Sequence, residues 1–164
     1  MKIWGLTKGW PYELFPHLKS KILFSSTFSA IDNENKIQND LGNMKAGGIS
    51  FDRYYRYKEI NEYLDSLPES NKNIVVKNVG KSYEGRDIKT VTITNGDGRK
   101  KNSVFIDAGI HAREWIAPAT ALYLIDQLTD SNSNLSKLLE KVDFVIHPLV
   151  NPDGYEFTFN FYRL

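Results

Sequence analysis

The chain has 164 residues, of which 41% are hydrophobic and 25% are charged, with 21 Lys and Arg against 20 Asp and Glu. This composition supplies enough apolar material for the core of one globular domain and excludes an intrinsically disordered chain. A net charge of +1 gives no electrostatic reason to expect nucleic acid or an anionic membrane as a partner. The absence of cysteine excludes a disulfide scaffold and the cysteine-ligated zinc folds.

The N-terminal part of the chain shows no clear pattern of helices or strands. Its longest apolar run, at residues 22–24, is far shorter than the roughly 20 residues needed to cross a bilayer. The run also begins too far from Met1 to act as a convincing secretion signal. Paired glycines at residues 47–48 suit a flexible joint. We therefore expect a poorly defined segment over residues 1–48 and a compact domain over residues 49–164.

The compact domain is predicted to begin with a helix and a pair of strands. Apolar side chains recur at steps of three and four over residues 57–67, which is the stripe of an amphipathic helix that ends before Pro68. Residues 74–79 and 88–94 are then rich in β-branched side chains. Because a turn-rich stretch at residues 80–85 separates them, they predict two antiparallel neighbours.

The second half of the domain predicts a strand, a crossover helix and a parallel strand. β-Branched and aromatic side chains at residues 104–108 favour a buried strand. A helical apolar face follows from Pro118, in the first turn, to Asp130. The mostly apolar residues 142–146 predict a strand parallel to the first and buried on both faces. Residues 151–154 predict a type I turn at the same carboxyl edge of the sheet.

Two residues with metal-binding side chains follow the strand at residues 104–108. His111 and Glu114 lie three residues apart, a spacing that brings an imidazole and a carboxylate to one side of a helical turn or tight bend. Zinc accepts both donors, but a catalytic zinc site uses three protein ligands. Spacing alone also allows a second interpretation, with His111 an ordinary polar residue at a strand end and Glu114 an acid favoured by the helix dipole.

His147 is a candidate for the third ligand, because the predicted topology places it near the carboxyl edge of the sheet. The alternative is a strand histidine that makes a local hydrogen bond. The sequence favours this alternative, since unliganded histidines are common.

Longer stretches around these residues resemble one known family. The strings H-A-R-E-W-I at residues 111–116 and N-P-D-G-Y at residues 151–155 are similar to the zinc metallocarboxypeptidases of the digestive A/B type. The string G-K-S-Y-E-G-R at residues 80–86 resembles the first connection of that family. The resemblance covers residues 49–164, and two long, spaced matches are far more specific than either one alone.

The resemblance implies an α/β fold, a mixed sheet with flanking helices, in which His111 and Glu114 are two of the three ligands of one zinc ion. It also implies that Arg113 contacts the substrate. Members of the family are secreted as precursors and release C-terminal residues from peptides and proteins, with neither nucleic acid nor membrane as a partner. An extracellular location is therefore implied, and residues 30–45 are either the tail of a pro-segment or a linker.

Several residues of the family's reaction have no counterpart in these 164 residues. The third zinc ligand, the general-base Glu and the oxyanion Arg are missing, and Arg163 matches only the first Arg of a later basic stretch. We therefore expect a fold that is incomplete at its C-terminal side and an inactive fragment without catalytic residues of its own. The rival interpretation is a non-catalytic short homologue that binds peptides or a partner protein. These residues do not indicate which C-terminal residue of a substrate the family member would prefer.

Overall fold

Eight regular elements make up the part of the chain that the computed structural model describes, which is residue 36 and residues 49–161. In chain order they are α3 (Tyr57–Ser70), β1 (Ile74–Lys81), β2 (Asp87–Ile93), β3 (Asn102–Asp107), α4 (Ile116–Thr129), the 3-10 helix η1 (Leu135–Glu140), β4 (Val142–His147) and α5 (Pro152–Phe161). Apart from residue 36, the predicted N-terminal segment lies outside the described residues, as do the joint at residues 47–48 and Arg163.

The strands form one mixed sheet in the order β1-β2-β4-β3. β1 pairs with β2 and β2 pairs with β4 in antiparallel fashion, whereas β3 and β4 run parallel. The predicted antiparallel neighbours and the predicted parallel strand pair are thus confirmed. The parallel pair is connected through α4, and Asp107 and His147 lie opposite each other at the end of its register.

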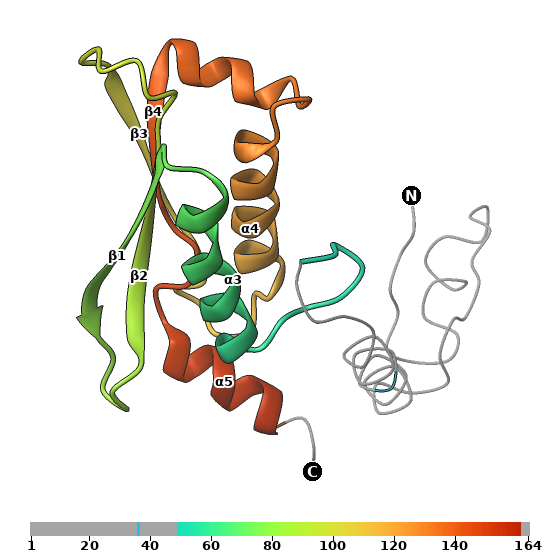
Figure 1. Ribbon diagram of the computed structural model, residues 1–164. Coiled ribbons are helices and arrows are strands. Elements are labelled where there is room, and N and C mark those ends of the chain that lie inside the picture. The colour runs from blue at the N-terminus through green and yellow to red at the C-terminus, as the bar shows by residue number, and fades with distance from the viewer. Residues whose placement is uncertain (1–35, 37–48, 162–164) are drawn as a thin grey trace, which may run out of the picture. The chain divides into compact units, whose positions relative to one another are not determined.

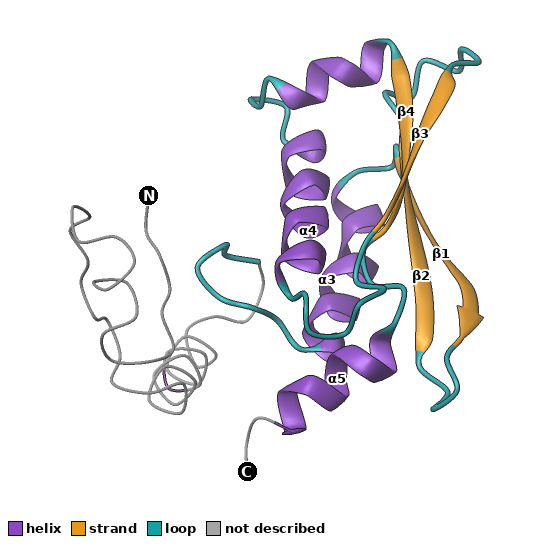
Figure 2. Ribbon diagram, turned by 180° about the vertical axis from the view of Figure 1, so that it is seen from behind, coloured by secondary structure: helices purple, strands orange, loops and turns teal. Residues whose placement is uncertain are grey.

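Helices α3, α4 and α5 lie on one side of the sheet (Figures 1 and 2). The core forms between these helices and the inward side chains of the two inner strands. Its buried members include Val91, Ile93, Phe144 and Ile146 from the sheet and Ile60, Leu64, Leu122 and Ile125 from the helices. Burial of each such side chain contributes roughly 1.5–3 kcal/mol relative to its exposure to water. None of the helices in the described residues is long and apolar enough to cross a membrane.

The prediction that the strands at residues 104–108 and 142–146 are fully buried is wrong for the described residues. β3 is an edge strand among the described residues, and its Val104 and Phe105 are 38% and 58% exposed. In β4, burial alternates: Phe144 and Ile146 are buried, while the residues beside them are only half-buried. The reason is that the described helices cover one face of the sheet, so apolar composition alone overstates the burial of the other face (Figure 2).

The first helix is longer than the sequence predicts. Pro68 lies inside α3, which continues to Ser70. Proline lacks the N–H that would donate to the carbonyl four residues earlier. Pro68 lies in the last turn of α3, so the helix loses this bond only near its end. The carbonyl of Leu67 accepts a hydrogen bond from the Asn71 N–H at 3.1 Å and another from the Ser70 hydroxyl at 2.8 Å. These contacts complete the helix end around the proline.

The predicted turn at residues 151–154 is the beginning of a helix instead. The side-chain oxygen of Asn151 accepts a hydrogen bond from the Gly154 N–H at 3.0 Å, and Pro152 is the first residue of α5. Asn before a helix and Pro at its first position are typical of a helix start, where the missing proline N–H costs nothing. The same residues therefore suit both a turn and a helix start.

Candidate metal centre

The loop that carries His111 lies at the carboxyl ends of the parallel strands. Beyond β3, the Ala108 N–H donates to the His147 carbonyl and the Val150 N–H donates to the Ala108 carbonyl, each at 2.9 Å. Gly109 then turns the chain with a φ of +70°, in close contact with Leu149. The loop thus lies at the edge where open α/β sheets bind ligands.

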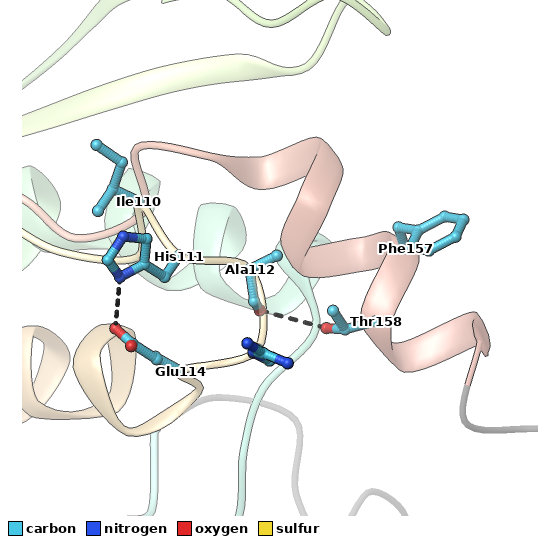
Figure 3. Close-up of a pocket in the computed structure, with 7 residues that line it drawn as sticks. Ile110, His111, Ala112, Glu114, Phe157 and Thr158 are labelled. Carbon is cyan, nitrogen blue, oxygen red and sulfur yellow. Dashed lines mark hydrogen bonds and ion pairs between the residues drawn. The ribbon is translucent and has the colours of Figure 1, made fainter.

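The structure brings the side chains of His111 and Glu114 together. Nδ1 of His111 lies 3.1 Å from Oε2 of Glu114 (Figure 3). The backbone forms a turn here, because the Glu114 N–H donates to the His111 carbonyl at 3.2 Å. Both side chains are largely exposed, at 71% and 58%. An imidazole nitrogen and a carboxylate oxygen, the two donors that suit zinc, are therefore accessible and converge.

The two side chains line an open pocket of about 620 Å³. The other residues of its lining are Ile110, Ala112, Arg113, Phe157 and Thr158. Figure 3 shows Phe157 and Thr158 on a helix that faces the loop. The three residues that the sequence singles out thus share one pocket, and their roles as zinc ligands and substrate contact stay predictions.

The first turn of α5 packs directly behind the loop. The side-chain amide of Asn151 donates to the Ile110 carbonyl, and its backbone N–H donates to the Gly109 carbonyl, both at 3.1 Å. At Gly154 a Cβ atom would lie 2.9 Å from the Cβ of Ala112. The helix and the loop are therefore too close for a side chain at this position.

Thr158 and Trp115 form a further contact between α5 and the loop, which the sequence alone does not reveal. The indole Nε1–H of Trp115 donates to the Thr158 Oγ1 at 2.8 Å. The same hydroxyl lies 2.7 Å from the Tyr155 carbonyl and 3.3 Å from the Ala112 carbonyl. Trp115 also stacks on Phe159, with ring centroids 4.0 Å apart and planes at 3°.

Asp153 fastens the start of α5 to the connection between β1 and β2. Its carboxylate accepts hydrogen bonds from the Ser82 hydroxyl at 2.7 Å, the Glu84 N–H at 2.9 Å and the Arg86 guanidinium at 2.6 Å. Burial acts to raise the pKa of Asp153, but these hydrogen bonds outweigh it and hold the pKa below its ordinary value. The residues that carry the resemblance at 80–86 and 151–155 are thus in direct contact.

His147 does not join the pair in this structure. It ends β4, and its ring lies edge-on to Phe105 with centroids 5.2 Å apart. Across residue 36 and residues 49–161, no three His, Asp or Glu side chains gather closely enough to hold a metal ion. Among the described residues, the candidate zinc ligands are therefore His111 and Glu114 alone.

Comparisons with known proteins identify the family of the chain. A sequence model of the family described as zinc carboxypeptidase matches residues 60–164. Carboxypeptidase B of Astacus astacus is 44% identical over 112 residues, which cover 68% of this chain and 37% of that protein. Zinc carboxypeptidase A 1 of Anopheles gambiae is 40% identical over 127 residues, which cover 76% of this chain and 29% of that protein.

Solved structures of the same kind share the fold. The crystal structures of thrombin activatable fibrinolysis inhibitor and of carboxypeptidase A from Helicoverpa armigera each match with a TM-score of 0.73 and 28% identity. They cover 80% and 92% of this chain, but only 34% and 39% of their own chains are matched. The chain belongs to the zinc carboxypeptidase family, and it spans between 29% and 39% of the length of these four relatives.

Proposed function

We propose that this chain contributes the histidine and glutamate ligands of the zinc ion in a metallocarboxypeptidase, which releases C-terminal residues from peptides or proteins. The observation that carries the proposal is the 3.1 Å approach of His111 Nδ1 to Glu114 Oε2, in an open pocket at the carboxyl edge of the sheet. Membership of the zinc carboxypeptidase family supports the class of reaction.

The donors fit zinc in kind, and they fill part of its coordination. A neutral imidazole nitrogen of His111 and a carboxylate oxygen of Glu114 would hold the ion, and a catalytic site uses one more protein ligand and an open position. When bound, zinc polarises the scissile carbonyl and lowers the pKa of a water molecule. We propose that the third ligand and the general base come from outside the described residues.

Arg113 is proposed to contact the substrate in the same pocket. Its guanidinium carries five N–H donors and a permanent charge, which suit the carbonyl and carboxylate oxygens near a peptide C-terminus. Ile110 and Phe157, which are 58% and 60% exposed, provide apolar surface in the pocket lining. A peptide would thus find a cationic contact beside apolar surface.

An extracellular location is part of the proposal, with zinc as the cofactor and the C-terminal ends of peptides as the substrate. The support for it is family membership together with the carboxypeptidase names of the relatives.

The test is peptidase activity on peptides with free and with blocked C-terminal carboxylates, measured in a protein that contains these residues together with the third ligand and the general base. We expect His111→Ala and Glu114→Ala to abolish release of the C-terminal residue, because each would remove a zinc ligand. His147→Ala is the matched control and should retain activity, since His147 lies outside the pocket lining. Unchanged activity in His111→Ala would refute the proposal.

A further inference from the structure

We infer that Thr158 is a positioning residue for His111 and Glu114, and that it acts through Trp115 and the loop backbone. The inference rests on the proposed function, because zinc is the ligand that His111 and Glu114 would share. Thr158 lies on α5 and has no group that binds metal strongly, so its role would be to hold other residues in place.

The Thr158 hydroxyl lies close to both ends of the segment that carries the candidate ligands. It accepts the indole N–H of Trp115 at 2.8 Å. It also lies 3.3 Å from the Ala112 carbonyl (Figure 3). Ala112 directly follows His111, and Trp115 directly follows Glu114. One side chain therefore contacts the backbone or ring next to each candidate ligand.

Thr158 is suited to this role because it is fixed itself. Only 9% of its surface is exposed, and its hydroxyl also lies 2.7 Å from the Tyr155 carbonyl of its own helix. The hydroxyl has a single proton, and the Tyr155 carbonyl is a closer acceptor for it than the Ala112 carbonyl. The Thr158 oxygen therefore keeps a lone pair for the Trp115 N–H, and the indole has an acceptor in a fixed position.

The candidate ligands need such support, since their own side chains are largely exposed at 71% and 58%. The Glu114 N–H bond to the His111 carbonyl, at 3.2 Å, is long for a backbone hydrogen bond. Stacking of Trp115 on Phe159 fixes the plane of the indole. The bond to Thr158 fixes which edge of the indole faces α5, and a half-buried indole N–H without an acceptor is unfavourable.

The expected size of the effect follows from the behaviour of other metal sites. Partners that orient the ligands of a metal typically change its affinity by about 10–100-fold when they are removed. Thr158 acts through a neighbouring residue and not on a ligand directly. We therefore expect loss of its hydroxyl to weaken zinc binding by about tenfold, at the lower end of that range.

The test compares Thr158→Val, which removes the hydroxyl, with Thr158→Ser, which keeps it, in the 164-residue chain. Thr90→Val is the matched control, because Thr90 is a buried threonine whose Oγ1 has no hydrogen-bond partner among the described residues. Zinc affinity is measured by competition with a chromogenic chelator. Amide hydrogen exchange at Glu114 is measured without metal, as a readout that does not depend on the proposed function.

We expect Thr158→Val to weaken zinc binding about tenfold and to speed exchange at the Glu114 amide. Thr158→Ser and Thr90→Val should match the unmodified chain in both measurements. Wild-type zinc affinity and wild-type exchange in Thr158→Val would overturn the inference. If Thr158→Val does not fold, Trp115→Phe removes the donor of the same bond, and wild-type behaviour of that variant would overturn the inference equally.

The two proposals fail in different ways. Zinc binding that is absent from the unmodified chain, or that survives His111→Ala, would count against the proposed function. The Glu114 exchange rates of the metal-free variants would still decide whether Thr158 holds the loop.

Discussion

Arg56 and Glu156 join the start of α3 to α5 across 100 residues of sequence, with Nη2 and Oε2 2.5 Å apart. Glu156 also accepts the backbone N–H of Tyr57 at 2.8 Å. Burial acts to raise the pKa of Glu156, but the hydrogen bonds from Arg56 and Tyr57 outweigh it and lower the pKa. The helix that supports the candidate metal loop is thus also anchored to the start of α3 by an ionised carboxylate.

We expect Glu156→Gln to lower the free energy of unfolding by about 1–3 kcal/mol, because it weakens charge-assisted bonds of a side chain that is mostly shielded from water. The matched control is Glu62→Gln. Glu62 pairs with Lys58 at 3.7 Å on the surface, where its side chain is 65% exposed, and its loss should cost less than about 0.5 kcal/mol. Urea unfolding measures both, and equal effects would contradict the account.

Stability should fall in acid through Asp153 and Glu156, whose pKa values both lie below their ordinary values in the folded chain. A carboxylate of this kind stabilises the fold above its unfolded-state pKa, near pH 4, and the contribution is lost as the pH falls through the folded-state pKa. We expect a flat profile from about pH 5 to 7 and a decline below about pH 4. Asp153→Asn with Glu156→Gln should flatten the decline in urea unfolding at graded pH. If the double variant loses stability in acid to the same extent, groups other than Asp153 and Glu156 cause the loss.

Gly109 should tolerate a side chain less well than Gly98. Its φ is +70°, and a Cβ atom would lie 2.8 Å from Leu149 Cδ1 and 2.9 Å from Pro118 Cγ. Gly98 shares the φ of +70° but has nothing within 4 Å of such an atom. We expect Gly98→Ala to cost about 1–2 kcal/mol of unfolding free energy, and Gly109→Ala to cost about 1–3 kcal/mol more through overpacking. Similar losses in the two variants, measured by urea unfolding, would show that the crowding at Gly109 relaxes freely.

The edge strand β3 should promote self-association of the chain. Its six residues include neither Lys nor Pro, which protect many edges, and Phe105 is 58% exposed. We expect sedimentation velocity to show larger species at rising concentration and fewer of them for Phe105→Lys. Val79→Lys is the control, because Val79 is 53% exposed on β1 but lies at a register irregularity of that edge. Concentration-independent sedimentation of the unmodified chain would contradict this prediction.

The sequence predicts the features that depend on local patterns. The strands at residues 104–108 and 142–146 are predicted from short β-branched, aromatic or apolar runs, and the helix up to Asp130 is predicted from its apolar face. A strand-helix-strand connection makes the two strands parallel, which brings their carboxyl ends to one edge of the sheet. The proximity of His111 to the residues around Asn151 follows from these two steps alone.

Features that depend on contacts between distant residues are not predictable in this way. Asn and Pro before Asp and Gly favour a turn and a helix start alike, and the contact of α5 with the loop decides between them. Thr158 follows Asn151 by seven residues, or two helical turns, so both lie on one face of a helix. This spacing becomes informative only once residues 151–161 are known to be helical.

The most direct measurement is calorimetric titration of zinc into the 164-residue chain at neutral pH, compared with His111→Ala and Glu114→Ala. We expect weak binding of one ion that both substitutions abolish, because the described residues offer two candidate donors and each variant removes one of them. Tight stoichiometric binding would show that a third ligand lies within these 164 residues, with His147 the first to test. Binding that persists unchanged in both variants would contradict the assignment of His111 and Glu114 as zinc ligands.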